Sequence, residues 1–421
     1  MTQRIALDQI IEAAPARVVV TQDASGQVTG AEFDLSGLPR VDAALVGRPV
    51  MEVPGLVERL CSICPTAHHL AGMRALESLA GLGQLPPTAE KVRRLLHHAG
   101  VIGIHVMGLI STDPDEALIL RRFSKAAMAA VGSPGHFPVT AVPGGVRAPA
   151  DPDLVQACTG LAGEALDAAL RVAGKALDTH VPLDHFTGAD LALIDSNGQL
   201  DLFGQDLRAV AADGTLIIAE APTDDWDSLI AEADPGSANP RPYLTPLGPG
   251  SGKYRVGPVS QLRVGPVSTP IAADLQQSWM SHHGGAHAAR AIITVHCVEV
   301  IASLLADPDL CHSDGHTPAA WWPSHLPAGA GVGWVDGARG LLVHRYAIDD
   351  DALVTSATIL TPTAQNEPWL SDLLRTAAQA TDEKDVRASM EDAIREADPC
   401  LPCSSAAPGT MDLEIDIEKG A

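Results

Sequence analysis

The chain has 421 residues and a mass of 43.7 kDa; 46% of the residues are hydrophobic and 3% aromatic, so a sizeable core can be built mainly from Ala, Val, Leu and Ile. The formal net charge of −24 makes nucleic acid and anionic membranes unfavourable partners. The seven cysteines are an odd number and three of them are scattered, which argues against a disulfide framework and favours a reducing compartment.

The N-terminus carries no apolar stretch of signal-peptide length. The longest apolar run, residues 99–110, is shorter than the roughly 20 residues that a membrane-spanning helix needs. We therefore expect a cytoplasmic protein without a membrane span, unless a partner carries an export signal.

Hydrophobic periodicity predicts a mainly α chain with small β excursions, which is the α+β class. Alternating residues around a Gly-containing turn predict an N-terminal hairpin over residues 16–35. Helices are expected where apolar residues recur every three or four positions, at 68–82, 89–110, 115–131, 152–177, 270–305, 368–380 and 382–397. Strands are expected at 200–203 and 215–219, with two more inside 333–360.

We expect residues 1–403 to form one large domain, with residues 185–253 as an excursion of loops and short strands that makes a small mixed β region. Residues 404–421 are acidic and interrupted by Gly and Pro, which predicts a tail that is either loose or removed. The sequence has no glycine-rich phosphate-binding motif, which argues against nucleotide binding by this chain.

Four of the seven cysteines form two Cys-x-x-Cys pairs near opposite ends of the chain. The first pair, Cys61 and Cys64, lies in Arg59-Leu-Cys-Ser-Ile-Cys-Pro-Thr-Ala-His, and the second, Cys400 and Cys403, lies in Asp398-Pro-Cys-Leu-Pro-Cys. Two thiolates three positions apart can face one ion, so the two pairs predict a four-sulfur metal site that joins the two ends.

The spacing alone favours a structural zinc ion, because Cys₄ zinc is the commonest site of this kind. Two features favour a reactive centre instead. Zinc pairs usually lie close together in the sequence because they hold small modules together, whereas a chain of this length has core enough without one. In addition, His68 follows Cys64 by one helical turn, within reach of a ligating thiolate.

The two cysteine motifs together resemble those of the large subunit of nickel–iron hydrogenases, and the similarity runs through most of the chain. The run from Gly331 to Tyr346 resembles the family's Glu-Ala-Pro-Arg-Gly segment, and Pro362-Thr-Ala-Gln-Asn resembles its Pro-Thr-x-x-Asn segment. Tyr254-Arg-Val-Gly-Pro resembles a run typical of the cytoplasmic, cofactor-coupled subclass.

The resemblance implies long helices around a buried metal centre. Nickel would be held by the thiolates of Cys61, Cys64, Cys400 and Cys403, and Cys64 and Cys403 would also bind an iron that carries CO and cyanide. Soft thiolate ligands suit low-valent nickel. The implied reaction is H₂ ⇌ 2 H⁺ + 2 e⁻, by heterolysis, with the proton passing to a nearby base.

The same resemblance assigns roles to side chains around the metals. Arg339 would lie over the diatomic ligands and be oriented by Asp115 and Asp398. His68 would donate a hydrogen bond to a cysteine sulfur, and Thr363 would donate one to an iron cyanide. Without the resemblance, Arg339 is a strand-end arginine in solvent, His68 a capping or core histidine and Thr363 a turn residue.

Pro362 precedes Thr363 and belongs to the same expected cofactor-binding segment.

Proton exit in the family uses a glutamate in an N-terminal Arg-Ile-Glu-Gly-His motif. Glu12 is the candidate here, although the flanking Arg, Gly and His are missing; its alternative is a glutamate on a surface helix.

The family's magnesium site departs further from this sequence. Asp42 stands where the family has a glutamate ligand, and Ala406 stands where it has a histidine ligand three residues after the last cysteine. Asp42 is therefore the one candidate magnesium ligand that these two positions offer. The same histidine marks the family's cleavage point, so removal of the acidic tail would occur near Ala406.

The electrons must leave the site, and the three remaining cysteines are too scattered to hold an iron–sulfur centre. The resemblance therefore implies a partner, the iron–sulfur small subunit of such enzymes, with NAD(P)- or deazaflavin-linked diaphorase subunits completing the complex. A maturation endopeptidase and nickel-insertion proteins are further expected partners.

Two other classes of function stay open at this point. One is an H₂-sensing regulatory subunit that keeps the site but has little turnover, which the altered surroundings of Glu12 and Ala406 fit. The other is a structural Cys₄ zinc protein. Complex I-type relatives have lost these cysteines, so the presence of all four argues against that branch.

Overall fold

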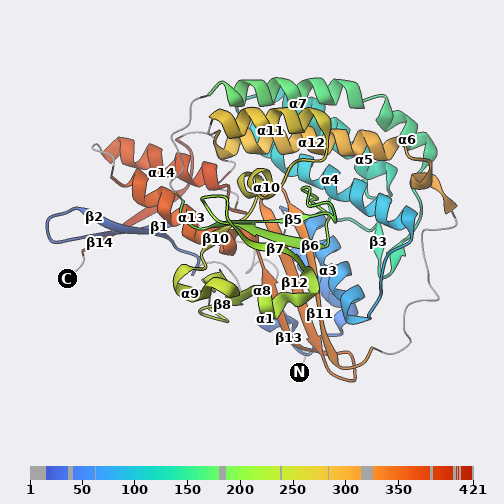
Figure 1. Cartoon of the computed structure of the whole chain (residues 1–421), viewed down its shortest axis with the longest axis horizontal. Coiled ribbons are helices and arrows are strands. Elements are labelled where there is room, and N and C mark those ends of the chain that lie inside the picture. The colour runs from blue at the N-terminus through green and yellow to red at the C-terminus, as the bar shows by residue number, and fades with distance from the viewer. Residues whose placement is uncertain are drawn as a thin grey trace.

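The structure is a computed structural model that describes residues 16–36, 41–61, 63–179, 186–237, 239–282, 284–313, 326–379, 383–401, 404, 406 and 409–419. It confirms the α+β class. Long helices form one layer, three small sheets pack beneath and beside them, and a further pair of helices lies next to the N-terminal hairpin (Figure 1).

The helical layer consists of the longer helices of the first half together with two from the second half. Proline occupies the first position of most of them, where its missing N–H would have no helical partner in any case. These helices are α4 (Pro87–Leu109), α5 (Pro114–Ala130), α6 (Pro152–Thr159), α7 (Ala162–Leu177), α11 (Pro270–His282) and α12 (Ala286–Leu305), and α3 (Pro65–Leu79) lies below them against the third sheet (Figure 1).

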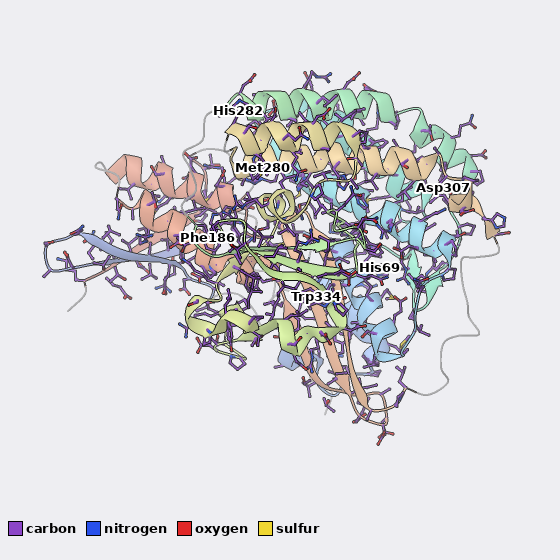
Figure 2. All side chains as sticks on the ribbon, in the orientation of Figure 1. His69, Phe186, Met280, His282, Asp307 and Trp334 are labelled. Atoms are coloured by element: carbon purple, nitrogen blue, oxygen red, sulfur yellow. The ribbon has the colours of Figure 1, made fainter. Side chains whose placement is uncertain are left out.

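Helix α12 is long and apolar enough to cross a membrane by length and composition alone, with a mean hydropathy of 1.7. Its most apolar window is 67% buried inside the protein, between α4, α7 and α11, which is typical of a core helix. Met280 and His282, by contrast, project from the exposed face of α11 (Figure 2).

The remaining helices are short, apart from the two that lead to the second cysteine pair. They are α1 (Asp42–Leu45), α2 (Val53–Leu60), α8 (Trp226–Leu229), α9 (Gly248–Ser251), α10 (Pro258–Val264), α13 (Pro362–Ala377) and α14 (Glu383–Ala397), with 3₁₀ turns at Val50–Glu52, Thr223–Asp225, Thr245–Leu247 and Pro308–Cys311. Helices α13 and α14 pack on each other, and α13 also packs on the N-terminal hairpin.

The strands form three main sheets and two isolated pairs. The first main sheet has the order β14-β1-β2, the second β10-β5-β6-β7 and the third β11-β12-β13. Their bounds are β1 (Ala16–Gln22), β2 (Val28–Phe33), β5 (Ala189–Ile194), β6 (Asp206–Val210), β7 (Leu216–Pro222), β10 (Tyr254–Arg255), β11 (Gly329–Gly337), β12 (Gly340–Ile348), β13 (Val354–Leu360) and β14 (Leu413–Lys419). The isolated pairs are β3 (Ala141–Val142) with β4 (Gly145–Val146), and β8 (Ile230–Glu232) with β9 (Pro242–Leu244).

The end of the chain is not a loose tail. Residues Leu413 to Lys419 form β14, which pairs in parallel with all of β1, from Ala16 to Gln22. Arg17 of β1 also binds Asp416 of β14 at 2.7 Å. The acidic residues of this segment alternate with apolar ones, which is the period of a strand rather than of a coil.

Other boundaries differ from expectation for local reasons. The helix expected at 152–177 breaks at Gly160 into α6 and α7, and the stretch 270–305 divides into α11 and α12. The helix expected from Pro368 begins six residues earlier, because the Thr361 side chain caps it by accepting from the Ala364 N–H. In place of the strand expected at 200–203, Leu200 makes two isolated β-bridges, to Ile194 and to Val267, and a turn follows.

The first of the two strands expected inside 333–360 is a tight hairpin instead. Strand β11 ends at Gly337 and β12 begins at Gly340, so Ala338 and Arg339 form the turn between them. Gly340 has φ +119°, a conformation that L side chains rarely adopt. This turn places Arg339 at the end of the sheet, beside α10 and the segment that follows α14.

Helix α3, which follows the first cysteine pair, packs directly on β11. The two side chains labelled here in Figure 2 lie outside this contact: His69 of α3 is bound to Glu58, and Trp334 of β11 packs against Trp226 on the other face of the sheet. The backbones approach so closely that a Cβ on Gly333 would lie 2.1 Å from the Ala71 carbonyl oxygen. Glycine at position 333 therefore holds the cysteine-bearing helix against the hairpin that carries Arg339.

Gly333→Ala is expected to destabilise the protein by at least about 3 kcal/mol, because neither backbone can move without unpacking α3 from the sheet. The matched control is Gly329→Ala in the same strand. There a Cβ would be 3.9 Å from its nearest neighbour, and a change within about 0.5 kcal/mol is expected. Thermal midpoints of the two purified variants would show the difference, and equal midpoints would contradict the packing described here.

Candidate metal centre

The first cysteine pair lies in the tight connection between α2 and α3. Cys61 follows the last residue of α2, and Cys64 is the N-cap residue of α3. The N-terminus of a helix carries a partial positive charge that stabilises a thiolate. A hydrogen bond holds the helices on the two sides of this turn together: His69 Nδ1 of α3 donates to the carboxylate of Glu58 in α2 at 2.9 Å. The other ring nitrogen of His69, Nε2, accepts from the Ala141 N–H.

The second pair approaches from the other end of the chain. Helix α14 ends at Ala397, and Asp398 adopts a positive φ of 47°, which turns the backbone toward the first pair. The backbone N–H of Cys400 donates to the Thr363 hydroxyl at the start of α13, at 2.7 Å. Cys400 is thus positioned by two helices, α13 and α14.

Three sulfur atoms meet at this point. The Sγ atoms of Cys61 and Cys64 are 3.1 Å apart, and those of Cys64 and Cys400 are 3.7 Å apart, across 336 residues of sequence. Sulfurs that bind one metal tetrahedrally at about 2.3 Å are separated by roughly 3.8 Å. The expected convergence of the two ends is therefore confirmed for these three cysteines; Cys403 lies outside the described residues.

The three thiols do not titrate alike. Hydrogen bonds from Cys400 and Cys64 lower the pKa of Cys61 well below its usual value, because a thiol that donates to a thiolate stabilises it. The pKa of Cys64 is raised, first by its hydrogen bond to Cys400 and then by that to Cys61. Bringing thiols this close favours at least one anionic sulfur, which is the form that binds metals.

Arg339 faces the sulfurs from the turn of the β11–β12 hairpin. It is 7% exposed, its Nη2 binds Asp398 Oδ1 at 3.1 Å and its Nε donates to the Asp398 carbonyl at 3.1 Å. Burial by itself lowers the pKa of Arg339, but Asp398 and the sulfurs of Cys400 and Cys64 raise it on balance. The guanidinium is therefore charged.

The hairpin turn is held by three buried side chains that bind its backbone or its carboxylate. His105 Nε2 donates to the Ala338 carbonyl at 3.0 Å, and His97 Nε2 donates to the Asp336 carbonyl at 2.9 Å. Gln261 Nε2 donates to Asp336 Oδ1 at 2.6 Å. Since these contacts come from α4 and α10, two separate elements fix the position of the arginine.

His68 is the first member of a hydrogen-bonded chain that runs away from the sulfurs. One of its ring nitrogens lies within 4.8 Å of the sulfurs of Cys61 and Cys64, and Nδ1 lies 2.9 Å from Nε2 of His344. Nδ1 of His344 lies 2.6 Å from the Tyr346 hydroxyl. Burial lowers the pKa of His68 to about 4 and that of His344 well below its usual value, so both rings are neutral.

The chain also orients the protons on the two rings. The hydroxyl proton of Tyr346 has no other acceptor among the described residues, so it is donated to His344 Nδ1. His344 then carries its proton on Nε2 and donates it to His68 Nδ1, which leaves an N–H on Nε2 of His68. That N–H is the donor that His68 can offer to a neighbouring sulfur.

The residues present fit a soft metal ion whose outer ligands accept hydrogen bonds. The described donors are thiolates, and a charged guanidinium stands over them with its Nη1 atom buried and without an acceptor in the described part of the chain. A buried donor without an acceptor costs about 1–3 kcal/mol. A metal with small polar ligands would offer such an acceptor.

Comparison with known proteins decides between these alternatives. The profile of the family described as nickel-dependent hydrogenase matches residues 41–109, which include the first cysteine pair. A solved NAD⁺-reducing [NiFe]-hydrogenase in the H₂-reduced state superimposes with a TM-score of 0.80 at 29% identity, over 91% of this chain and 95% of that one. The chain is similar to nickel-dependent hydrogenases along most of its length.

Curated relatives of this family match along nearly the whole length. A vhu-type F420-non-reducing hydrogenase chain of Methanococcus voltae is 29% identical over 86% of this chain and 95% of its own length. The beta chain of the NAD-reducing hydrogenase HoxS of Cupriavidus necator is 27% identical over 99% of this chain and 97% of its own length. The Ni-Fe-Se hydrogenase of D. vulgaris Hildenborough, at 18% identity and a TM-score of 0.67, shares the fold.

Among the residues expected around the hydrogenase centre, Asp398 lies where it was expected and Asp115 does not. Asp398 pairs with Arg339, as described above. Asp115 is exposed in the first turn of α5, because Pro114 begins that helix and directs the residue to solvent. Its carboxylate complements the helix dipole there, so the expectation that Asp115 orients Arg339 was wrong.

The expected cofactor-binding residues at the start of α13 do reach the centre. Pro362 is the first residue of α13, and Thr363 follows it and accepts the Cys400 N–H. This contact positions Cys400 of the second cysteine pair. The sequence did not indicate the contact. The expected hydrogen bond from Thr363 to an iron ligand stays a prediction.

The two remaining candidates do not join the centre in the described residues. Asp42 lies at the start of α1, where its carboxylate accepts the N–H of Ile359 in β13 at 3.0 Å. Within the described ranges, the one group of three or more possible metal-ligating side chains is Cys61, Cys64 and His68, so the structure gives no support to a magnesium site at Asp42. Glu12, the expected proton exit, lies outside the described residues.

Sequence reasoning missed Arg290, His344 and Tyr346. Arg290 of α12 binds the other carboxylate oxygen of Asp398 at 3.6 Å, and nothing in its surroundings in the sequence indicates this. His344 and Tyr346 had a weak signal, because they stand on alternate positions of the same strand that follows Arg339 and therefore share one face.

Thr363→Val is expected to weaken the second cysteine pair, because the Cys400 N–H loses its acceptor at a cost of about 1–3 kcal/mol. Nickel should then be lost faster to a chelator, by roughly tenfold or more. Thr363→Ser keeps the hydroxyl and should retain metal like the unaltered protein. If valine and serine variants lose nickel at the same rate, the hydroxyl does not support the site.

Proposed function

We propose that this chain is the catalytic large subunit of a nickel–iron hydrogenase, which interconverts H₂ with protons and electrons. The observation that carries the proposal is the sulfur cluster: Cys64 and Cys400 come from opposite ends of the chain and lie 3.7 Å apart beneath a buried, charged arginine. The match to the nickel-dependent hydrogenase family over residues 41–109 and the likeness to a solved [NiFe]-hydrogenase support the same function.

Cys61, Cys64 and Cys400, together with Cys403 as the predicted fourth ligand, would hold nickel and an iron that carries CO and cyanide, with the long helices around them. When bound, these metals supply the place where H₂ is polarised and split. Thiolates suit the role because they are soft and neutralise the metal charge. The lowered pKa of Cys61 favours the thiolate, the form that binds metals.

Arg339 would contribute a fixed positive charge over the centre. Its Nε and Nη2 are engaged by Asp398, which leaves Nη1 to point away from that pair as a donor for a small ligand. The narrow cavity beside it is lined mainly by apolar side chains, including Val256, Pro258 and Trp369, which limits competition from water. In such a water-poor site a single oriented charge has a large effect.

His68 would offer its Nε2–H to a cysteine sulfur and so tune the basicity of that sulfur. Its low pKa keeps the ring neutral, and the hydrogen bonds through His344 to Tyr346 hold it in the tautomer that donates. The ring itself therefore acts as a donor to the site rather than as a titrating base.

The chain does not work alone in this proposal. Its relatives are named as subunits of multi-subunit hydrogenases, and its own remaining cysteines, Cys158, Cys297 and Cys311, are scattered along the sequence. The electrons would pass first to an iron–sulfur small subunit, then to NAD(P)- or deazaflavin-linked diaphorase subunits in the cytoplasm. Assembly would require nickel-insertion proteins and a maturation endopeptidase, and cleavage near Ala406 stays a prediction.

The direct test is H₂-dependent dye reduction by the complex co-purified with its iron–sulfur partner under anaerobic conditions. Turnover that is lost when H₂ is replaced by argon is the expected result. A complex that contains nickel and iron but lacks turnover would instead be a sensor. A complex that contains zinc and no nickel would be a structural zinc protein and would contradict the proposal.

A further inference from the structure

Arg290 of α12 binds the last turn of α14, the helix that leads to the second cysteine pair. Its Nη1 and Nη2 donate to the Arg395 carbonyl at 3.0 and 2.9 Å, and Nη2 also donates to the Glu396 carbonyl at 3.0 Å. Carbonyls in the last turn of a helix have no partner within the helix, and a cation there complements the helix dipole. Arg290 therefore caps α14 just before the chain turns toward Cys400.

The junction between the two helices is reciprocal. The carboxylate of Glu396, near the end of α14, accepts the N–H of Ala286, the first residue of α12, at 2.6 Å. A negative group thus lies at the start of α12 and a positive group at the end of α14, as the two helix dipoles favour. Because each helix binds the free end of the other, the guanidinium of Arg290 has a fixed place beside the residue that follows α14, Asp398.

The same guanidinium reaches the carboxylate that holds Arg339. Arg290 Nη1 lies 3.6 Å from Asp398 Oδ2, and Arg339 Nη2 lies 3.1 Å from Asp398 Oδ1. A carboxylate held by one cation can still turn about its own axis, whereas a cation on each oxygen fixes its plane. All three side chains line one narrow cavity and are at least four-fifths buried, so these contacts are not the weak ion pairs of an exposed surface.

Burial distinguishes Arg290 from an arginine that only caps a helix. Two guanidinium groups share one carboxylate here, and the Nε of Arg290 is buried without an acceptor among the described residues. A buried donor without an acceptor lowers stability, and a cation in solvent complements a helix C-terminus equally well. Capping of α14 therefore does not by itself explain an arginine at this place.

Arg290 also supplies a constraint that the sequence had assigned to another residue. Asp115, expected as a second group that orients Arg339, is exposed at the start of α5. Asp398 is the carboxylate that pairs with Arg339 in the described part of the chain, and its backbone has a positive φ of 47°. One carboxylate on a strained backbone must then set the direction of the arginine, and the contact of its other oxygen with Arg290 holds it in place.

We propose that Arg290 is a positioning residue for the hydrogenase reaction: anchored on the end of α14, it fixes the Asp398 carboxylate, and that carboxylate fixes the direction in which Arg339 presents Nη1. The inference rests on the proposed function, under which Arg339 faces the CO and cyanide ligands of the iron. Arg290 makes no contact with a sulfur among the described residues, so it acts through Asp398 and Arg339.

The test is Arg290→Lys in the complete hydrogenase complex, with rates counted per nickel atom. Lysine keeps the charge, but a single ammonium cannot hold two carbonyls and a carboxylate in fixed directions at once. Turnover per nickel should fall roughly tenfold, because a misdirected group at a reacting centre is costly. The infrared bands of CO and cyanide should shift while the nickel content is retained. Arg290→Met should have at least the same effect, and the lysine variant decides alone if the methionine variant does not bind nickel.

The matched control is Glu299→Ala. Glu299 lies on the same helix and binds the backbone N–H groups of Ile271 and Ala272 at the start of α11, much as Arg290 binds the end of α14. Its loss should lower the thermal midpoint but leave the infrared bands and the turnover per nickel unchanged. If Arg290→Lys shifts no band and turns over per nickel within about twofold of the unaltered complex, Arg290 has a structural role only and the inference is refuted, while the hydrogenase function stands.

A double variant tests the route through Arg339. In the Arg339→Lys background, Arg290→Lys should lower turnover by less than about twofold further, because the group that it positions is already lost. If the two losses multiply in full, Arg290 acts by another route and the positioning role is refuted. An unaltered complex without nickel, without CO and cyanide bands and without turnover would instead overturn the proposed function itself.

Discussion

Replacing Cys61 by serine is expected to abolish both nickel binding and hydrogen turnover. Cys61 is 3.1 Å from Cys64, and hydrogen bonds from Cys400 and Cys64 lower the pKa of its thiol, which favours the thiolate that binds a metal. A serine hydroxyl is a hard ligand that stays protonated at neutral pH, and it cannot replace a soft thiolate at low-valent nickel. Nickel per chain, measured by elemental analysis of the purified protein, should fall to background.

Cys311→Ser is the matched control for this variant. Cys311 is likewise partly buried, but it lies in the 3₁₀ turn after α12, and burial raises its pKa rather than lowering it. It should keep the nickel content and the turnover of the unaltered protein. A Cys61→Ser protein with full nickel and activity would remove this cysteine from the centre.

Arg339→Lys is expected to lower turnover by roughly a hundredfold or more with the metals retained. Lysine keeps the charge, but its ammonium cannot use one edge for Asp398 and still present a second donor in a fixed direction. Because no sulfur ligand changes, nickel and iron content should stay the same. Dye reduction and metal content measured on one preparation separate the two effects.

Arg345→Lys controls for the loss of any arginine in the same sheet. Arg345 lies on β12, six residues after Arg339, and pairs with the exposed Asp227 at 3.5 Å. An exposed ion pair contributes little, so turnover should be unchanged. Equal rates for Arg339→Lys and Arg345→Lys would mean that the buried guanidinium has no part in the reaction.

The metal centre was the part of the protein most accessible from sequence, because its chemistry requires particular residue types at fixed spacing. The two Cys-x-x-Cys pairs, Arg339 and Asp398 could be named from their motifs, and the structure brings Cys400 to Cys64 as expected. The prediction for Asp115 was wrong because a motif gives a position along the chain but not the face of the helix on which the residue lies.

The features that sequence could not supply depend on packing between distant segments. Glu367 directly precedes the helix expected from Pro368, and it is buried because the N-terminal sheet covers α13. The hairpin turn at Arg339 was not predicted, because Ala-Arg has no turn signature apart from the glycine after it. The strand at 413–419 had a signal in its alternating Leu and Ile, which its acidic composition obscured.

The infrared spectrum of the purified complex tests the central claim most directly, because CO and cyanide absorb where protein and water leave an empty window. Sulfurs from both ends of the chain that enclose one nickel–iron pair require these bands, and the bands should shift when H₂ is replaced by argon. A spectrum without them, from a protein that carries one zinc ion per chain, would contradict the account.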